Sequence, residues 1–140
     1  METRPTKLTI IAWFSIIIGL FSISGSGGYL VAAIMSEAPI RFGIEYQVIL
    51  QFITSLLIML GGVGVLLGKP ISQKILLASY GLLAFLIVII IGKYAFGIQY
   101  GTGDKIVFIV NFLFMLAPVI FVLLVLRSDE TKSYFADIET

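Results

Sequence analysis

The sequence predicts an all-α membrane protein, an antiparallel bundle of four transmembrane helices with both termini in the cytoplasm. Of its 140 residues, 59% are hydrophobic and only 12% are charged, whereas an ordinary soluble protein has about 25% charged residues. Four runs contain no charged residue and approach the roughly 20 residues that cross a bilayer; they cover residues 8–35, 48–68, 75–92 and 106–126. Because the connections are short, we expect one domain, residues 1–140, without an extramembrane part.

The first run follows Arg4 and Lys7, and it begins like a secretory signal. Because its apolar character resumes over residues 29–35, we expect an uncleaved first span. The run is longer than a bilayer requires, and the segment from Ser24 to Gly28 holds three glycines. This segment predicts either a helix break that offers backbone groups to an ion or substrate, or a surface for close helix packing, and packing is the favoured interpretation.

Small residues recur every three or four positions in the first two runs, which is typical of helices whose backbones approach closely. We therefore predict helix-packing roles for Ser15, Gly19, Ser22, Gly25, Gly28, Ala32, Gly61, Gly64 and Gly68.

Uncharged polar side chains gather near the outer ends of the runs. Gln47 and Gln51 begin the second run, and Thr54 and Ser55 share a helical face with Gln51. Together with Asn111 and Lys93, they predict a shallow ligand pocket that opens outward; the candidate ligand-binding residues are Gln51, Thr54, Ser55, Asn111 and Lys93. The alternative, which we favour, is that these groups form hydrogen bonds between helices.

The cations indicate the orientation, because Lys and Arg are retained on the cytoplasmic side. Three cations lie in the outer connections, namely Arg41, Lys93 and Lys105. Six lie on the side of the termini, namely Arg4, Lys7, Lys69, Lys74, Arg127 and Lys132. This distribution places both termini inside.

The tail, residues 127–140, predicts a short amphipathic helix. Ser128 is its expected cap, and Tyr134, Phe135 and Ile138 follow at helical spacing. We expect this apolar turn to lie on the membrane surface or on a partner.

Several functions lack the residues they need. The chain has no cysteine and no histidine, so we expect no metal site, no cofactor and no thiol or imidazole chemistry. No acid lies inside a run, and the net charge is only +1. We therefore predict no catalytic residue, no proton-coupled transport and no binding of nucleic acid.

The stretch from Arg4 to Phe14, followed by Gly19, resembles the opening of a group of small uncharacterised bacterial inner-membrane proteins with four predicted spans. The pair Tyr134-Phe135 resembles their ending. The chain departs from them after Gly68, where many members have a Trp-Ala-Arg element and this one has residues 69–74, KPISQK. The resemblance implies a bacterial cytoplasmic membrane and no particular activity.

These observations predict a non-enzymatic polytopic protein, a structural or accessory subunit whose small-residue faces pack against itself or other membrane subunits in the lipid bilayer. The alternative is a small homo-oligomeric channel or carrier for a neutral or lipidic ligand. If the segment from Ser24 to Gly28 and the outer polar cluster meet in one cavity, the alternative is favoured; if they face helix contacts, the accessory role is favoured.

Overall fold

A computed structural model describes residues 4–36, 42–96 and 101–139, and within these ranges the chain is helical, without a strand. The elements are α1 (Thr6–Met35), α2 (Phe42–Leu66), α3 (Ile71–Phe96), α4 (Thr102–Arg127) and α5 (Asp129–Glu139). Of these described helices, four are long and apolar enough to cross a membrane, which confirms the predicted number of spans. The helices extend beyond several of the predicted runs, because helical structure continues through polar residues at the membrane boundaries.

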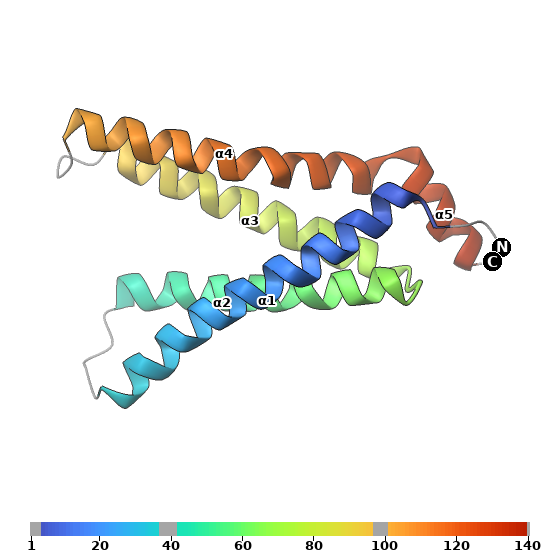
Figure 1. Ribbon diagram of the computed structural model, residues 1–140, viewed down its shortest axis with the longest axis horizontal. Helices are drawn as coiled ribbons and strands as arrows, with labels where there is room; N and C mark the ends of the chain where they lie inside the picture. Colours follow the sequence, from blue (N-terminus) through green and yellow to red (C-terminus); the bar gives the residue numbers. More distant parts are fainter. Residues whose placement is uncertain (1–3, 37–41, 97–100, 140) are drawn as a thin grey trace.

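The four long helices form two pairs, α1 with α2 and α3 with α4 (Figure 1). The pairs meet where the two chain ends and the α2–α3 turn lie, which we call the closed end. They diverge toward the other end of the molecule, which we call the open end. Many buried apolar side chains lie toward the closed end, among them Leu8, Ile11, Leu76, Tyr80 and Leu126.

The segment from Ser24 to Gly28 does not break α1, so the prediction of a helix break is wrong. The helix is continuous from Thr6 to Met35, so the less favoured of the two interpretations is the one excluded. The Ser24 hydroxyl donates to the Leu20 carbonyl at 2.9 Å, and the Ser26 hydroxyl donates to the Ser22 carbonyl at 2.6 Å. Backbone groups at membrane depth must be hydrogen-bonded within the protein, which explains why three glycines do not open the helix.

Small residues let α1 and α2 approach closely. A Cβ atom placed on Gly19 would lie 2.7 Å from the Cβ of Met59. One placed on Gly62 would lie 2.7 Å from the carbonyl oxygen of Ala12. Both distances are shorter than side-chain contacts allow, so glycine is required at these two positions for the observed packing of α1 on α2.

Gly61 and Gly64 perform the same role between α2 and α3. A Cβ on Gly61 would lie 2.6 Å from a methyl carbon of Leu76, and one on Gly64 would lie 2.7 Å from the Cβ of Ser72. The predicted packing glycines of the second span therefore contact a neighbour within the same chain.

Gly68 has a different role from the predicted one, because it ends α2. Its φ of +67° lies in the left-handed region that glycine tolerates best. The Lys69 amide donates to the Gly64 carbonyl at 2.8 Å, and the Gly68 amide donates to the Val65 carbonyl at 3.1 Å. These two bonds form a Schellman motif, which satisfies carbonyl groups at the end of the helix.

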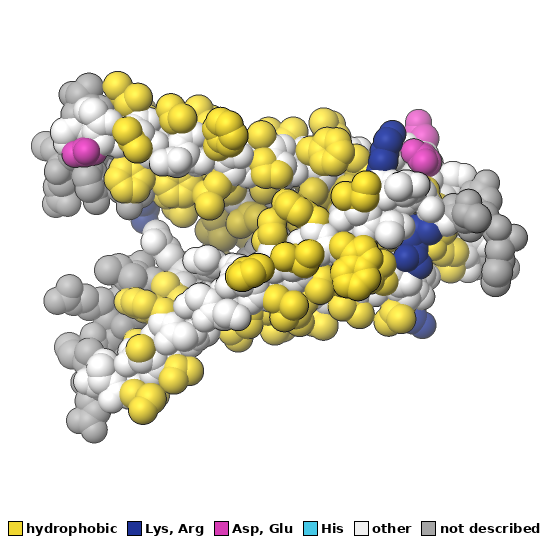
Figure 2. Space-filling model, in the orientation of Figure 1, with side chains coloured by type: hydrophobic (Ala, Val, Ile, Leu, Met, Phe, Trp, Pro, Cys, Tyr) yellow, Lys and Arg dark blue, Asp and Glu magenta, His cyan; other side chains and the backbone are white. Residues whose placement is uncertain are grey.

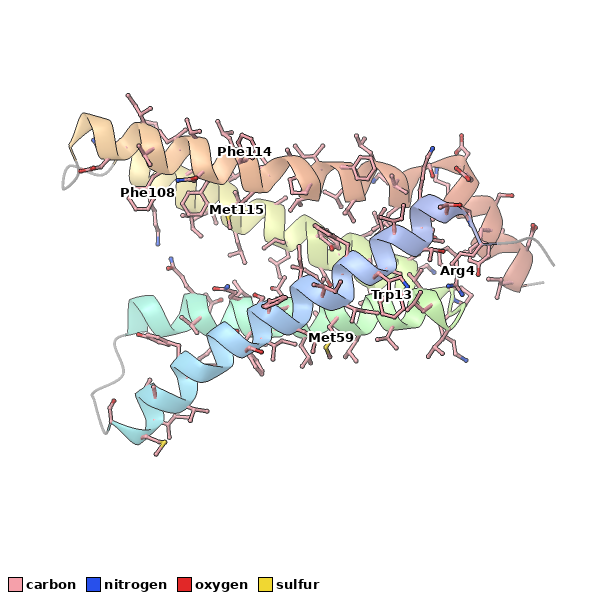
Figure 3. All side chains as sticks on the ribbon, viewed as in Figure 1. Arg4, Trp13, Met59, Phe108, Phe114 and Met115 are labelled. Atoms are coloured by element: carbon pink, nitrogen blue, oxygen red, sulfur yellow. The ribbon has the colours of Figure 1, made fainter. Side chains whose placement is uncertain are left out.

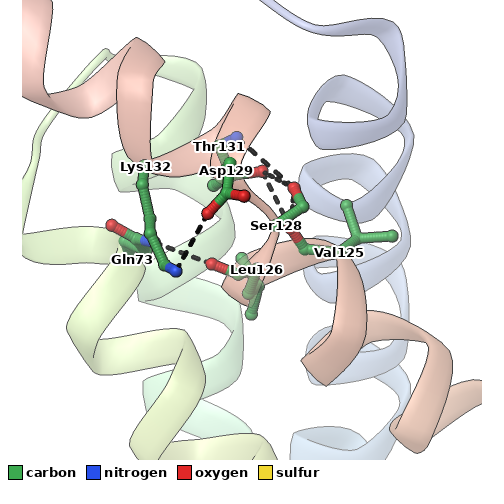
Figure 4. Close-up of polar contacts among 7 residues, drawn as sticks. All are labelled: Gln73, Val125, Leu126, Ser128, Asp129, Thr131 and Lys132. Carbon is green, nitrogen blue, oxygen red and sulfur yellow. Dashed lines mark hydrogen bonds and ion pairs between the residues drawn. The ribbon is translucent and has the colours of Figure 1, made fainter.

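The tail forms α5, and its apolar turn packs on the chain's own closed end. The amide of Thr131 donates to the Ser128 hydroxyl at 3.4 Å, which confirms the predicted cap (Figure 4). Tyr134 and Phe135 are buried, whereas Ile138 stays 42% exposed. We expected the apolar turn to lie on the membrane surface or on a partner, and for Tyr134 and Phe135 this expectation is wrong. The bundle itself offers these two residues an apolar surface.

Candidate functional site

A cleft of about 770 Å³ separates the α1–α2 pair from the α3–α4 pair. In the space-filling view it corresponds to the notch between the two arms of the molecule (Figure 2). Its volume falls in the range of small-molecule sites, roughly 300 to 1,000 Å³.

The α1–α2 wall of the cleft contributes hydrogen-bonding groups. Gln47, Gln51 and Ser55 follow one another at intervals of four residues along α2, and Ser22 meets them from α1. The hydroxyl of Ser55 donates to the hydroxyl of Ser22 at 2.6 Å and is 2.7 Å from the carbonyl oxygen of Gln51. The amide of Gln51 donates to Ser22 at 3.4 Å. We call these four residues the polar strip.

The α3–α4 wall is apolar. It presents Leu86, Ile87 and Ile90 from α3, and Phe112 and Met115 from α4. Figure 3 shows Met115 on α4, beside Phe114, whose side chain is 80% exposed and is not among the residues that line the cleft. The two walls therefore differ in chemistry, since one offers amides and hydroxyls, whereas the other is hydrocarbon and a thioether apart from the hydroxyl of Tyr80.

A buried hydrogen bond lies where the cleft narrows toward the closed end. The hydroxyl groups of Ser15 and Tyr80 are 2.8 Å apart, and both residues are at most 1% exposed. This bond joins α1 to α3, and Leu8, Ile11 and Leu76 are buried in the same core cluster as Tyr80. The cleft thus ends in packed side chains, an arrangement that suits a binding pocket better than a continuous pore.

The structure brings only part of the predicted ligand cluster together. Gln51 and Ser55 line the cleft, but Thr54, Asn111 and Lys93 do not. The segment from Ser24 to Gly28 does not line it either, so this segment and the polar cluster do not meet in one cavity. Thr54 is buried and donates to the Leu50 carbonyl at 2.7 Å. Asn111 is exposed, because the neighbouring Phe112 takes the position on α4 that faces the cleft. Lys93 is exposed near the end of α3.

Sequence reasoning missed three members of the site. Ser22 was predicted to serve helix packing, yet it also binds both Ser55 and Gln51. Gln47 was placed at the start of the second run but not among the ligand candidates. Tyr80 was not singled out, although a tyrosine in the middle of an aliphatic run needs a hydrogen-bond partner and is a signal in itself.

The predicted packing residues divide between two environments. Ser15 and Gly19 are buried against neighbouring helices. By contrast, a Cβ placed on Gly25 or Gly28 would meet no atom within 4 Å, and Ala32 is exposed. Gly25, Gly28 and Ala32 therefore face away from the rest of the described chain, whereas Ser26 is buried and Gly27 lies against Phe52.

Comparison with models of protein families, with curated proteins and with solved structures gave no significant match. The chemistry of the cleft is therefore the basis for assigning a function. Its polar lining groups are amides, hydroxyls and one phenol, which recognise a ligand by hydrogen bonding. Among the described residues, no three Asp, Glu, His or Cys side chains gather as they would around a metal ion.

Proposed function

We propose that this chain is a non-enzymatic carrier that binds a neutral or lipidic molecule in the cleft between its two helix pairs. The observation that supports this function best is the convergence of Gln47, Gln51, Ser55 and Ser22 on one wall of a cleft whose other wall is apolar. A predominantly apolar pocket with a few convergent polar groups is the usual form of a small-molecule site. A carrier also agrees better with the packed closed end than a channel does.

The membrane arrangement is part of the proposal. Four antiparallel spans in a bacterial cytoplasmic membrane, with both termini inside, would place the mouth of the cleft on the outer side. The distribution of cations supports this orientation. Since the chain has no cysteine, Lys93→Cys and Lys132→Cys each introduce a unique thiol. An impermeant maleimide should label Lys93→Cys in intact cells and Lys132→Cys only after permeabilisation; the reverse pattern would refute the orientation.

A cleft-filling variant tests the binding function. Leu86 lines the cleft, and Val88, two residues along α3, is 54% exposed and does not. The purified protein should retain a lipidic molecule in native mass spectrometry after mild extraction from its membrane. Leu86→Trp should lose that molecule and Val88→Trp should keep it. Equal retention by the two variants would argue against the cleft as the site.

A second function, that of an accessory subunit, is supported by the outward position of Gly25, Gly28 and Ala32. Glycines without a neighbour inside the chain suit close contact with another helix, either of a second copy or of a larger membrane subunit. Gly28→Leu should then reduce the mass of the particle extracted in mild detergent. Gly92→Leu is the matched control, because Gly92 is helical and also has no atom within 4 Å of an added Cβ. An unchanged particle in Gly28→Leu would count against this role.

A further inference from the structure

The polar strip has hydrogen-bonding capacity that the described chain does not use. Ser22 and Ser55 bond to each other, and Ser22 also accepts from the Gln51 amide. Gln51 keeps its side-chain carbonyl and a second N–H, since a carboxamide has two donors and an acceptor with two lone pairs. Gln47 makes no side-chain hydrogen bond to any residue that the structure describes. Two carboxamides, one helical turn apart, are therefore available to a ligand.

In the proposed membrane arrangement, these carboxamides lie at the outer edge of the hydrocarbon region. Gln47 is the second residue of the apolar span Tyr46–Leu66, and Gln51 lies about 6 Å further along α2 at 1.5 Å per residue. Acyl chains can fill an apolar cleft, but they cannot bond to an amide, and an amide without a partner in hydrocarbon is unfavourable. A molecule that offers hydroxyl or carbonyl groups at this depth relieves that penalty, whereas bulk acyl chains do not.

The charges around the cleft restrict the chemical class of that molecule. None of the described residues that line the cleft is charged, and Lys93 is not among them. A phosphate, carboxylate or ammonium head group would therefore enter a low-dielectric cleft without a counter-charge, which is costly. A head group with neutral hydroxyl or carbonyl groups meets the donors and acceptors of the two amides directly.

We propose that the cleft selects an uncharged lipid, with its hydroxyl- or carbonyl-bearing head between Gln47 and Gln51 and its hydrocarbon chain directed inward along the apolar wall toward Tyr80. This inference rests on the proposed binding function and adds the class and orientation of the ligand. The hydrocarbon chain of the lipid packs against Leu86, Ile87 and Met115. The Ser15–Tyr80 pair marks the depth at which the cleft ends.

The test compares three photoreactive lipids with the same diazirine-bearing acyl chain and different heads: a monoacylglycerol, a fatty acid and a lysophosphatidylglycerol. Each is titrated into the full-length protein in phosphatidylcholine nanodiscs, and the labelled peptides are mapped. The monoacylglycerol should bind about tenfold more tightly than the two anionic lipids, equivalent to about 1.4 kcal/mol, the sum expected for two neutral hydrogen bonds. Its diazirine should label α3 and α4 residues of the apolar wall.

Variants separate recognition of the head from binding of the chain. The double variant Gln47→Leu with Gln51→Leu should bind the monoacylglycerol about tenfold more weakly, because its head loses two hydrogen bonds, so the preference over the anionic lipids narrows while the acyl chain still occupies the cleft. Asn111→Leu is the control, because it removes an amide that does not line the cleft, and it should keep the preference. Leu86→Trp should abolish labelling by every lipid.

The outcomes distinguish the two levels of the proposal. Equal binding of the three lipids by the unaltered protein, with Leu86→Trp still blocking them, would overturn the head-group inference and leave the binding function standing. Labelling that is insensitive to Leu86→Trp, or a cleft occupied by a second copy of the chain, would overturn both. Tighter binding of an anionic lipid, abolished by Lys93→Gln, would also overturn the inference of an uncharged head.

Discussion

The close packing of α1 on α2 at Gly62 makes a sharp prediction for Gly62→Ala. The added methyl group would lie 2.7 Å from the carbonyl oxygen of Ala12 and 3.0 Å from a side-chain carbon of Ile16. A side chain can rotate away from such a contact, but a backbone oxygen held in a helix cannot. The two helices must therefore move apart by a few tenths of an ångström along the face where they pack.

The magnitude follows from two opposing effects. Overpacking a well-packed contact destabilises a protein by about 1 to 3 kcal/mol, and replacing glycine by alanine inside a helix stabilises it by about 1 kcal/mol. We expect Gly62→Ala to lower the free energy of unfolding by about 1 kcal/mol. In Gly28→Ala the new methyl group meets no atom within 4 Å, so only the stabilising effect, up to about 1 kcal/mol, remains. The two variants should differ by about 2 kcal/mol.

Reversible unfolding in mixed micelles, by titration with sodium dodecyl sulfate, measures this difference. Trp13 is the only tryptophan in the sequence and lies on α1, so its fluorescence follows the unfolding of this helix. A Gly62→Ala protein as stable as Gly28→Ala would refute the packing of α1 on α2 described above.

Three further predictions concern the closed end. Gly68→Ala should lower the free energy of unfolding by about 1 kcal/mol in the same titration, because φ is +67° at this position; unchanged stability would contradict the left-handed turn. Tyr80→Phe and Ser15→Ala should each cost about 1 kcal/mol, and a double-mutant cycle should find them coupled; additive effects would exclude the bond. Arg4 donates to the Leu66 carbonyl at 2.5 Å and to the Tyr134 hydroxyl at 3.5 Å, so Arg4→Gln should speed amide hydrogen exchange in α5. Lys132→Gln removes only an exposed ion pair and should leave amide hydrogen exchange in α5 unchanged. Equal exchange rates in the two variants would contradict the role of Arg4.

The number of spans could be predicted from the sequence because bilayer thickness sets the length of each apolar run. The ends of the helices were less predictable. The second run continues to Gly68 by hydropathy, but α2 ends at Leu66, since the left-handed Gly68 makes the terminating turn. Hydropathy describes the solvent that surrounds a residue, whereas helix ends depend on backbone hydrogen bonds.

The site was predictable only in part, because spacing places residues on one face of a helix but does not say what that face meets. Gln51 and Ser55 line the cleft as their spacing allowed, whereas Thr54, on a neighbouring position, is buried and bonded to its own helix. To predict that Asn111 lies outside the cleft, one must know how α4 is rotated about its axis. Gly62 faces α1, whereas Gly61 faces α3. This difference likewise depends on how the helices cross, which a single sequence does not state.

The difference between the two ends of the molecule indicates how the cleft could respond to its ligand. At the closed end, the Ser15–Tyr80 bond joins the helix pairs, and α5 covers them. On the open side of that bond, the hydrogen bonds of the polar strip stay within the α1–α2 pair. Lipid is as apolar as these helices, so no hydrophobic force closes the open end. The angle between the pairs should then depend on what fills the cleft.

Spin labels test this coupling in the cysteine-free chain. Tyr46 on α2 and Val107 on α4 are 67% and 62% exposed near the open end, so labels at Tyr46→Cys and Val107→Cys report the separation of the two pairs. Leu67→Cys and Leu124→Cys form the control pair at the closed end. A ligand that bonds to one wall and packs on the other selects a narrow range of angles. Monoacylglycerol should therefore narrow the distance distribution of the first pair and leave the second unchanged. Binding of the lipid without any change at the open end would mean that the angle is set by the protein alone.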